Sequence, residues 1–274
     1  MTASHGLSAP RPGWDCHAHI FDGRPLVRAG HYDPPVRDLA SLEQEARTLG
    51  VGHAVLVQPS VYGTDNGLLL AALRESGGAH RGIVVVDDTV SEEAMHGMHA
   101  MGVRGVRFNL VSPAGNDSEA LERLAPRLRD HGWHVQWYAT PGSLSMIAEL
   151  HERLGLRCVL DHVGGFTRSL AGDAELWKRL RHLADMGAWI KLSGWYRLGA
   201  SAPYESLDAM IARVAALFGT HCVWGSDWPH THFLELGNRE PMPSYADAWR
   251  PVLRALGNEH AQRILCEYPR SLYE

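Results

Sequence analysis

An aspartate and two histidines occupy alternate positions in the otherwise apolar run 14–21, WDCHAHIF. Every second side chain of a β-strand points to the same face, so Asp15, His17 and His19 are expected to share one face. Paired imidazoles can bind a transition metal or stabilise negative charge that develops during a reaction. The run therefore predicts a strand whose end carries chemistry.

Two later apolar runs also end in polar residues. The run 157–165 contains Asp161 and His162, and the run 222–230 contains Asp227. If the runs are parallel strands of a barrel, their carboxyl ends open into one mouth, and these side chains meet the two histidines of the first run. We expect Asp161 to point away from this mouth and to support the structure. The predicted catalytic set is His17, His19, His162 and Asp227.

Strand-like and helix-like segments alternate along the chain, which is typical of parallel strands joined by right-handed crossovers. Several of the helical segments begin at Asp or Ser and end at Gly, as helix caps prefer. The expected strands are 14–21, 52–60, 82–88, 102–110, 133–140, 157–165, 188–195 and 222–230. Helical patterns lie at 37–50, 65–78, 117–132, 142–155, 173–187 and 204–219.

Eight such units favour an α/β fold of the (β/α)8 TIM-barrel type, which could be distorted. The 274 residues fit one barrel, which needs about 250 residues. We therefore expect a single domain over 1–274, with residues 1–12 as a flexible tail. Neither GxGxxG after the first strand nor GxxxxGK[ST] occurs, so nucleotide-binding sheets are disfavoured.

Composition excludes several classes of function. The net charge is −5 and no long basic run occurs, which argues against nucleic-acid binding. No apolar stretch approaches the roughly 20 residues of a membrane span, and the N-terminus lacks a signal-peptide core. The four cysteines fit no zinc-finger or redox spacing. We expect reduced thiols in a cytoplasmic protein that acts on a small molecule.

An ordered set of motifs resembles the amidohydrolase superfamily, amidohydrolase 2 type, over nearly the whole chain. DCHAH near the N-terminus and GSDWPH near the C-terminus carry the general resemblance. QPSVYGTDN, GVRGVRFN, LDHVGG and the closing EYPRSLY are similar to the lactonase branch that includes 2-pyrone-4,6-dicarboxylate lactonase. The resemblance implies a hydrolase of aromatic-compound catabolism that opens the ester ring of a small, carboxylated lactone, either 2-pyrone-4,6-dicarboxylate-like or muconolactone-like.

The resemblance also implies roles for individual residues. Asp227 would act as the general base that activates water, and His17, His19 and His162 would polarise the lactone carbonyl. Arginine forks suit carboxylates, so two arginines would bind the acid groups of the substrate. The substrate-binding positions carried over are Arg107, Arg197, Tyr138, Ser60 and Tyr32.

Departures from the superfamily pattern limit the cofactor and the substrate. Two-metal members carry a bridging Lys or Glu on the fourth strand and a further His on the fifth. Here those strands offer Asn109, Gln136 and Tyr138, so a two-metal site is not expected. Pro113 stands where the lactonase has another carboxylate-binding arginine, which weakens the match to a planar dicarboxylate and leaves a substrate with one acid group, or with a differently placed one. We favour a site without metal; the alternative is a single zinc on His17, His19, His162 and Asp227.

Three other functions remain open from the sequence. One is a zinc-dependent sugar-acid lactonase, and another is a metal-dependent decarboxylase of the same superfamily. Metal analysis, with activity before and after chelation, separates these from a metal-free lactonase. The third is a non-catalytic barrel, which the intact set of polar residues at the strand ends disfavours. A homo-oligomer is compatible with the sequence.

Overall fold

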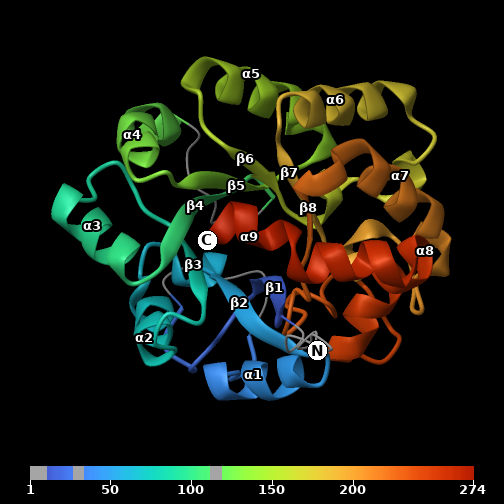
Figure 1. Ribbon diagram of the computed structural model, residues 1–274, viewed down its shortest axis with the longest axis horizontal. Coiled ribbons are helices and arrows are strands. Elements are labelled where there is room, and N and C mark those ends of the chain that lie inside the picture. The colour runs from blue at the N-terminus through green and yellow to red at the C-terminus, as the bar shows by residue number, and fades with distance from the viewer. Residues whose placement is uncertain (1–10, 27–33, 112–118) are drawn as a thin grey trace, which may run out of the picture.

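The computed structural model describes residues 11–26, 34–111 and 119–274. Within these ranges, eight parallel strands follow one another around a single sheet in the order β1 to β8 (Figure 1). Each begins within one residue of its predicted start and stops one to six residues before its predicted end. The strands are β1 (Gly13–Ala18), β2 (Val51–Val57), β3 (Arg81–Val84), β4 (Val103–Asn109), β5 (His134–Tyr138), β6 (Cys158–Leu160), β7 (Trp189–Leu192) and β8 (Cys222–Trp224).

Helices form the outer layer around the strands, which confirms the predicted (β/α)8 TIM barrel (Figure 1). Their buried faces carry mostly Leu, Ala, Ile and Met, as amphipathic helices on a barrel require. They are α1 (Leu39–Arg47), α2 (Gly67–Glu75), α3 (Glu92–Ala100), α4 (Glu119–Asp130), α5 (Leu144–Leu154), α6 (Ala174–Asp185), α7 (Asp208–Phe218), α8 (Tyr245–Cys266) and α9 (Tyr268–Tyr273).

The barrel is irregular where its last strand meets its first. β8 is only three residues long, and the closure continues through the segment that follows it, with Ala18 paired to Trp228. The His19 amide donates to the Trp228 carbonyl at 2.8 Å, and the Asp227 amide donates to the His17 carbonyl at 2.9 Å. This seam brings the first and last predicted motifs side by side.

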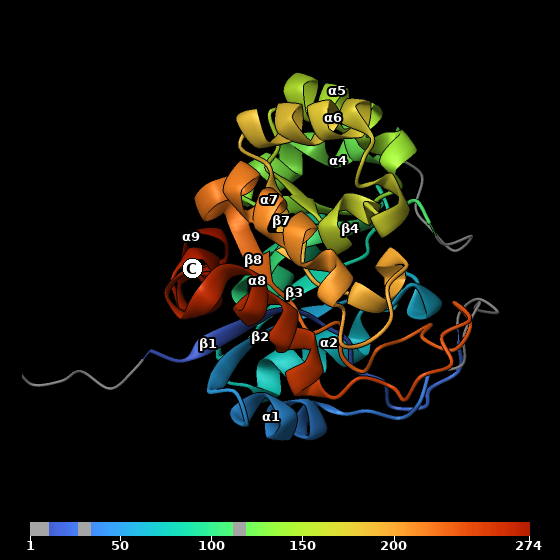
Figure 2. The ribbon, with the colours of Figure 1, turned by 90° about the vertical axis from the view of Figure 1, so that its right-hand side faces the viewer.

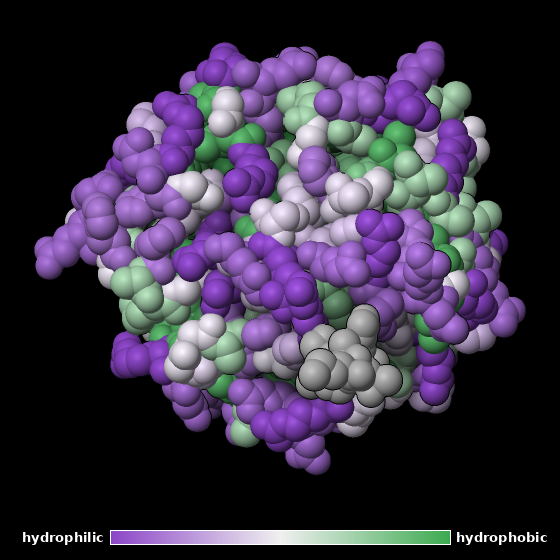
Figure 3. All heavy atoms as spheres, in the orientation of Figure 1, coloured by the Kyte–Doolittle hydropathy of each residue, from purple (hydrophilic) through white to green (hydrophobic). Residues whose placement is uncertain are grey.

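The two ends of the barrel differ. α9 covers the end of the barrel where the strands begin. The Tyr273 ring stacks on the Trp14 ring at 5.8 Å and meets the His134 ring edge to face at 5.6 Å. In Figure 2 α9 lies at the left, and the segments after β1 and β8 extend to the right, at the opposite end. Figure 3 views the α9 end, whose surface is mainly hydrophilic with scattered apolar patches. The mouth of the barrel therefore lies on the side away from α9.

Other expectations have mixed outcomes. The four cysteines, all within the described ranges, are free and buried. None of the described helices is long and apolar enough to cross a bilayer. The expected N-terminal tail falls almost entirely outside the described residues, so it stays a prediction.

The burial of His134, on β5, is expected to make the free energy of unfolding depend on pH. The side chain is fully buried and neither ring nitrogen has a hydrogen-bond partner among the described residues. Burial, with a further contribution from Lys191, lowers the pKa of His134 well below 6.5. The unfolded chain therefore binds a proton at this residue below about pH 6.5 that the folded chain does not bind, so stability falls as pH falls.

His134→Leu is expected to remove this contribution, which is about 1.4 kcal/mol per pH unit below the unfolded pKa. Urea unfolding at pH 7.5, 6.5 and 5.5 measures the slope, with the exposed His182→Leu as control. An unchanged slope in His134→Leu would contradict the prediction.

Candidate active site

The four predicted catalytic residues meet at the mouth of the barrel. His17 lies on β1 and His19 directly after it, His162 follows β6, and Asp227 follows β8. Asp227 Oδ1 lies 3.7 Å from His17 Nε2, 3.8 Å from His19 Nε2 and 3.9 Å from His162 Nε2. All four side chains are buried. Residues from three distant parts of the sequence thus surround one point.

The other nitrogen of each imidazole is held by a neighbour. His19 Nδ1 donates to the Val57 carbonyl at 2.7 Å, so this nitrogen carries the hydrogen. Burial, reinforced by Arg107, lowers the pKa of His19 to about 3, so the ring is neutral near pH 7 and its Nε2 presents a lone pair. His162 Nδ1 lies 3.0 Å from the Ser193 hydroxyl.

The sequence analysis expected Asp161 to point away from the site, but this prediction is wrong: the side chain points toward His17. Its Oδ1 lies 3.1 Å from His17 Nδ1, and its Oδ2 accepts from Gln136 Nε2 at 3.0 Å. β6 ends at Leu160, so strand alternation no longer sets the direction of this side chain. Burial opposes ionisation, but His17 and Lys191 hold the pKa of Asp161 well below its usual range. The carboxylate thus accepts the hydrogen of His17 Nδ1, leaving a lone pair on His17 Nε2.

Lys191 is a second member of this buried network, and the sequence analysis missed it. It lies on β7, donates to Gln136 Oε1 at 2.6 Å, and is 3.4 Å from Asp161 Oδ1. Burial lowers the pKa of Lys191. A lysine inside the apolar run AWIKLSGW is the signal that could have revealed it, because buried charges require partners.

Two residues after β7 hold the far oxygen of Asp227. Arg197 Nε donates to Asp227 Oδ2 at 2.7 Å, and the Tyr196 hydroxyl donates to the same oxygen at 2.7 Å. Burial disfavours the charged carboxylate, but Arg197 and the nearby imidazoles hold the pKa of Asp227 well below its usual range. Tyr196 was not predicted from the sequence. Arg197 was predicted to bind substrate, and here its Nε is bound to Asp227 while Nη2 donates to the Thr231 carbonyl at 2.8 Å.

Three of the other predicted substrate-binding residues, Tyr138, Arg107 and Ser60, form a connected group that reaches the His162 imidazole. The Tyr138 ring lies 5.0 Å from the His162 ring, and the guanidinium groups of Arg107 and Arg197 lie 5.7 and 5.6 Å from the Tyr138 ring. Arg107 Nη1 is 3.4 Å from the Ser60 hydroxyl. Tyr32 and Pro113 are outside the described residues.

Two glycines permit the imidazoles to pack this closely. A Cβ on Gly194, whose φ is +62°, would lie 2.5 Å from His162 Nδ1, and a Cβ on Gly225 would lie 2.5 Å from His17 Cβ. Contacts that short do not occur, so any larger residue must displace the histidine.

Gly194→Ala is expected to lower kcat/KM at least tenfold, because it moves His162 away from Asp227. Gly199→Ala is the matched control: its φ is +73°, but a Cβ there meets nothing within 4 Å. Both variants carry similar backbone strain, so the difference between their steady-state kinetics reports the contacts of the new Cβ, of which that with His162 is the shortest and that with Arg197 Cδ, at 3.1 Å, the next. Equal losses in the two variants would refute this role for Gly194.

Three of the convergent residues, His17, His19 and Asp227, have ligand atoms close enough together to hold a single zinc ion, and His162 Nε2 lies 3.9 Å from Asp227 Oδ1. Tetrahedral ligands about 2.0–2.1 Å from zinc lie roughly 3.3–3.4 Å apart, and here His17 Nε2 and His19 Nε2 are 3.3 Å apart. With lone pairs on both nitrogens and a carboxylate beside them, the site carries converging negative potential that a cation relieves. His162 Nε2 and Asp227 Oδ1 have no hydrogen-bond partner in the described part of the chain. The partners of the Nδ1 atoms resemble those that orient metal-binding histidines.

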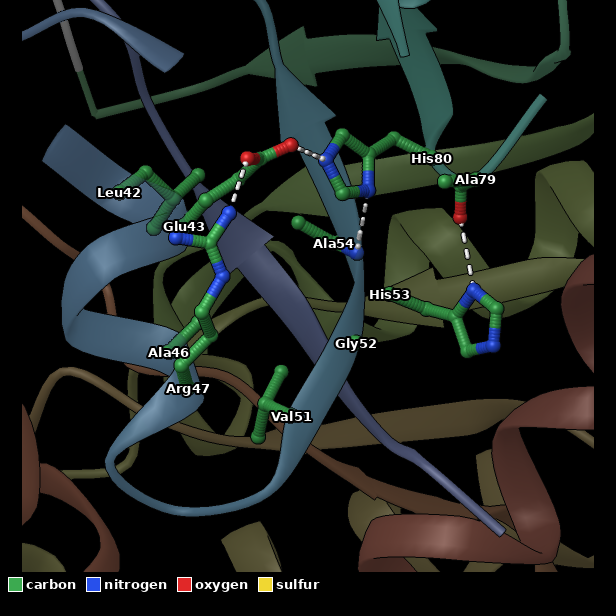
Figure 4. Close-up of a pocket in the computed structure, with 10 residues that line it drawn as sticks. All are labelled: Leu42, Glu43, Ala46, Arg47, Val51, Gly52, His53, Ala54, Ala79 and His80. Atoms are coloured by element: carbon green, nitrogen blue, oxygen red, sulfur yellow. Dashed lines mark hydrogen bonds and ion pairs between the residues drawn. The ribbon is translucent and has the colours of Figure 1, made fainter. Parts of the chain in front are cut away.

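A separate cavity of about 140 Å³ lies at the start of β2 (Figure 4). There His80 Nε2 is 3.2 Å from Glu43 Oε1, Arg47 donates to Glu43 Oε2, and the Ala54 amide donates to His80 Nδ1. These polar groups bind one another across α1 and β2. Since catalytic residues of such barrels lie at the other end, we interpret this cavity as structural.

Comparisons with known proteins agree with the geometry. The amidohydrolase family model matches residues 14–273. The chain is 27% identical to a 4-sulfomuconolactone hydrolase of Rhizobium radiobacter over 99% of this chain and 93% of that protein. It is 28% identical to a protein named 2-pyrone-4,6-dicarboxylate hydrolase from Comamonas testosteroni, over 96% and 90% of the two chains. It is 30% identical to the D-galactarolactone isomerase of Agrobacterium fabrum, over 97% and 92%.

Solved structures show the same architecture. A putative 2-pyrone-4,6-dicarboxylic acid hydrolase from Pseudomonas putida superposes with a TM-score of 0.83 at 30% identity, covering 96% of this chain and 97% of that one. A probable hydrolase of the same name from Acinetobacter baumannii, with citric acid bound, gives 0.82 at 27% identity, covering 95% and 98%. The motifs, the barrel and the full-length family match lead to one assignment: the chain belongs to the amidohydrolase 2 family.

Proposed function

We propose that this enzyme hydrolyses the ester ring of a small anionic lactone. One observation carries the proposal: Asp227 Oδ1 lies within 3.9 Å of three imidazole nitrogens at the barrel mouth. This oxygen of the ionised carboxylate accepts no hydrogen bond from the described residues. A carboxylate in this position can take a proton from an attacking water.

Only one carboxylate oxygen of Asp227 is left facing the pocket. Arg197 and Tyr196 fix Oδ2, so Oδ1 faces the pocket and accepts the proton as water adds to the lactone carbonyl carbon. The ring C–O bond then breaks, the proton passes from Asp227 to the departing alkoxide oxygen, and a hydroxy acid forms. Atoms and charge balance with water as the co-reactant.

The residues that would hold a metal are His17, His19, His162 and Asp227. A bound zinc would polarise the carbonyl and lower the pKa of water. The sequence favoured a site without metal, with the imidazoles donating to the carbonyl oxygen. The lone pair on His19 Nε2 is incompatible with that role for this ring, because a neutral imidazole donates through only one nitrogen. We therefore propose the zinc alternative for the cofactor.

The proposed substrate carries an acid group. Arg107 and Arg197 flank Tyr138 next to His162, so positive charge lies beside the reacting carbonyl. Both arginines also face protein carboxylates: Arg197 Nε lies 2.7 Å from Asp227 Oδ2, and Arg107 Nε lies 3.6 Å from Asp161 Oδ2. The number and position of the acid groups expected from Pro113 stay a prediction. The names of the relatives, a sulfomuconolactone hydrolase and a pyrone-dicarboxylate hydrolase, support an anionic lactone.

A panel of lactones tests this function. The enzyme is incubated in ¹⁸O-labelled water with muconolactone, 4-sulfomuconolactone, 2-pyrone-4,6-dicarboxylate or an uncharged sugar lactone. Mass spectrometry then measures the masses of the products. Hydrolysis places one ¹⁸O in the product acid, whereas isomerisation, the activity named for one relative, places none. Loss of carbon dioxide would indicate the decarboxylase, preference for the sugar lactone would favour the sugar lactonase, and a wholly inert panel would favour a non-catalytic barrel.

A further inference from the structure

We propose that the protein has a second metal site, on the outside of the barrel, formed by Glu92, His96 and His131. Within the described residues, it is the only such group of three metal-binding side chains outside the active site. α3 and α4 lie next to each other in the outer layer (Figure 1), and the group joins them. The proposal is independent of the proposed function.

Helix geometry places two of the three ligands. α3 begins at Glu92, and His96 lies four residues later, so both side chains are on one face of the helix. His131 follows the last residue of α4, Asp130. The three side chains therefore come from two consecutive β/α units.

The distances suit one ion. Glu92 Oε1 lies 3.0 Å from His131 Nε2 and 3.7 Å from His96 Nδ1, and one donor atom from each residue lies within 4.8 Å of the others. The two rings are 4.6 Å apart and meet nearly edge to face. His131 is nearly buried at 7% exposure. His96 Nδ1 donates to the Glu92 backbone carbonyl at 2.9 Å, so the 70% exposed His96 ring would have to rotate to present a lone pair to the ion.

The donor types select the kind of metal. Two imidazoles and one carboxylate favour zinc, nickel or copper(II) over magnesium or calcium, which prefer all-oxygen sites. Exposure leaves the remaining coordination positions to water. His99 packs 5.7 Å from His131, but its Nδ1 accepts the Trp133 indole hydrogen at 3.1 Å, so we do not count it as a ligand.

Zinc chloride titration of the full chain by calorimetry tests the site, with His96→Ala and Glu92→Gln as variants. Each variant is expected to weaken binding at one class of sites at least tenfold and to leave lactonase activity unchanged. Glu92→Gln keeps an oxygen that can accept from His131, so the local packing survives. His182→Ala is the matched control, because His182 pairs with Glu152 at 3.2 Å but belongs to no group of three metal-binding side chains among the residues that the structure describes.

The active site is counted separately. If the active site keeps its zinc through purification, or binds none, the wild type shows a single class, the outer one, and each variant loses it. In protein stripped of metal whose active site does bind zinc, the wild type shows two classes and each variant loses only the outer one. Titrations of His96→Ala and Glu92→Gln that match the wild type would overturn the proposal. So would an equal loss in His182→Ala, or wild-type binding at this class only above millimolar zinc.

Discussion

Asp227→Asn is expected to lower kcat by at least about a thousandfold while the fold is retained. The amide keeps the shape of the carboxylate but cannot take a proton from water, and general-base assistance contributes about 10²–10⁴-fold. The substitution also removes the negative charge that Arg197 and the three imidazoles surround. Steady-state kinetics on the best lactone of the panel measure the loss.

Two controls give this result its meaning. Circular dichroism and thermal unfolding of Asp227→Asn establish that the barrel survives. Tyr196→Phe removes one of the two donors to Asp227 Oδ2 and leaves Arg197 in place, so a smaller loss is expected. An Asp227→Asn enzyme with kcat within tenfold of the wild type would exclude Asp227 as the base.

Purified protein is expected to contain about one tightly bound zinc per chain, and its removal is expected to lower activity at least a hundredfold. The reason is the convergence of lone pairs described above: His17 Nε2 and His19 Nε2 are 3.3 Å apart beside an ionised carboxylate. Mass spectrometry of the metal content, before and after dialysis against a chelator, measures occupancy. Added zinc should restore both occupancy and activity.

His19→Ala should lose the tight zinc, and His96→Ala should retain it, because His96 lies in the outer cluster. Full activity in a chain stripped of metal would instead establish the metal-free chemistry that the sequence favoured. The lactonase proposal would survive that outcome with Asp227 as base, whereas the role of the imidazoles would change.

The alternation of strand and helix patterns was sufficient to predict the barrel. Each pattern is local, because apolar side chains recur with the period of the strand or helix whose buried face they form. His17 and His19 could be placed on one strand face, since their spacing is local. Asp227 could be joined to them only through the barrel rule that strand ends share a mouth.

Local patterns failed where the backbone leaves the strand. Asp161 was expected to point away, but β6 ends one residue earlier and the carboxylate turns to His17. The predicted binding of substrate by Arg197 stays a prediction, but no strand pattern indicated that the turn after β7 also brings its Nε to Asp227.

The fold class and the four side chains at the mouth could be predicted from the sequence alone, because strand and helix periodicity and the order of the motifs are properties of the chain itself. The nitrogen of each imidazole that faces the pocket, and the network of Lys191, Gln136 and Asp161 next to His17, are visible only in the folded chain. Those relations depend on hydrogen bonds between neighbouring strands, whose partners are set by the closure of the barrel. The same closure joins His17 to Asp227 across the β1–β8 seam, a contact that no local pattern encodes.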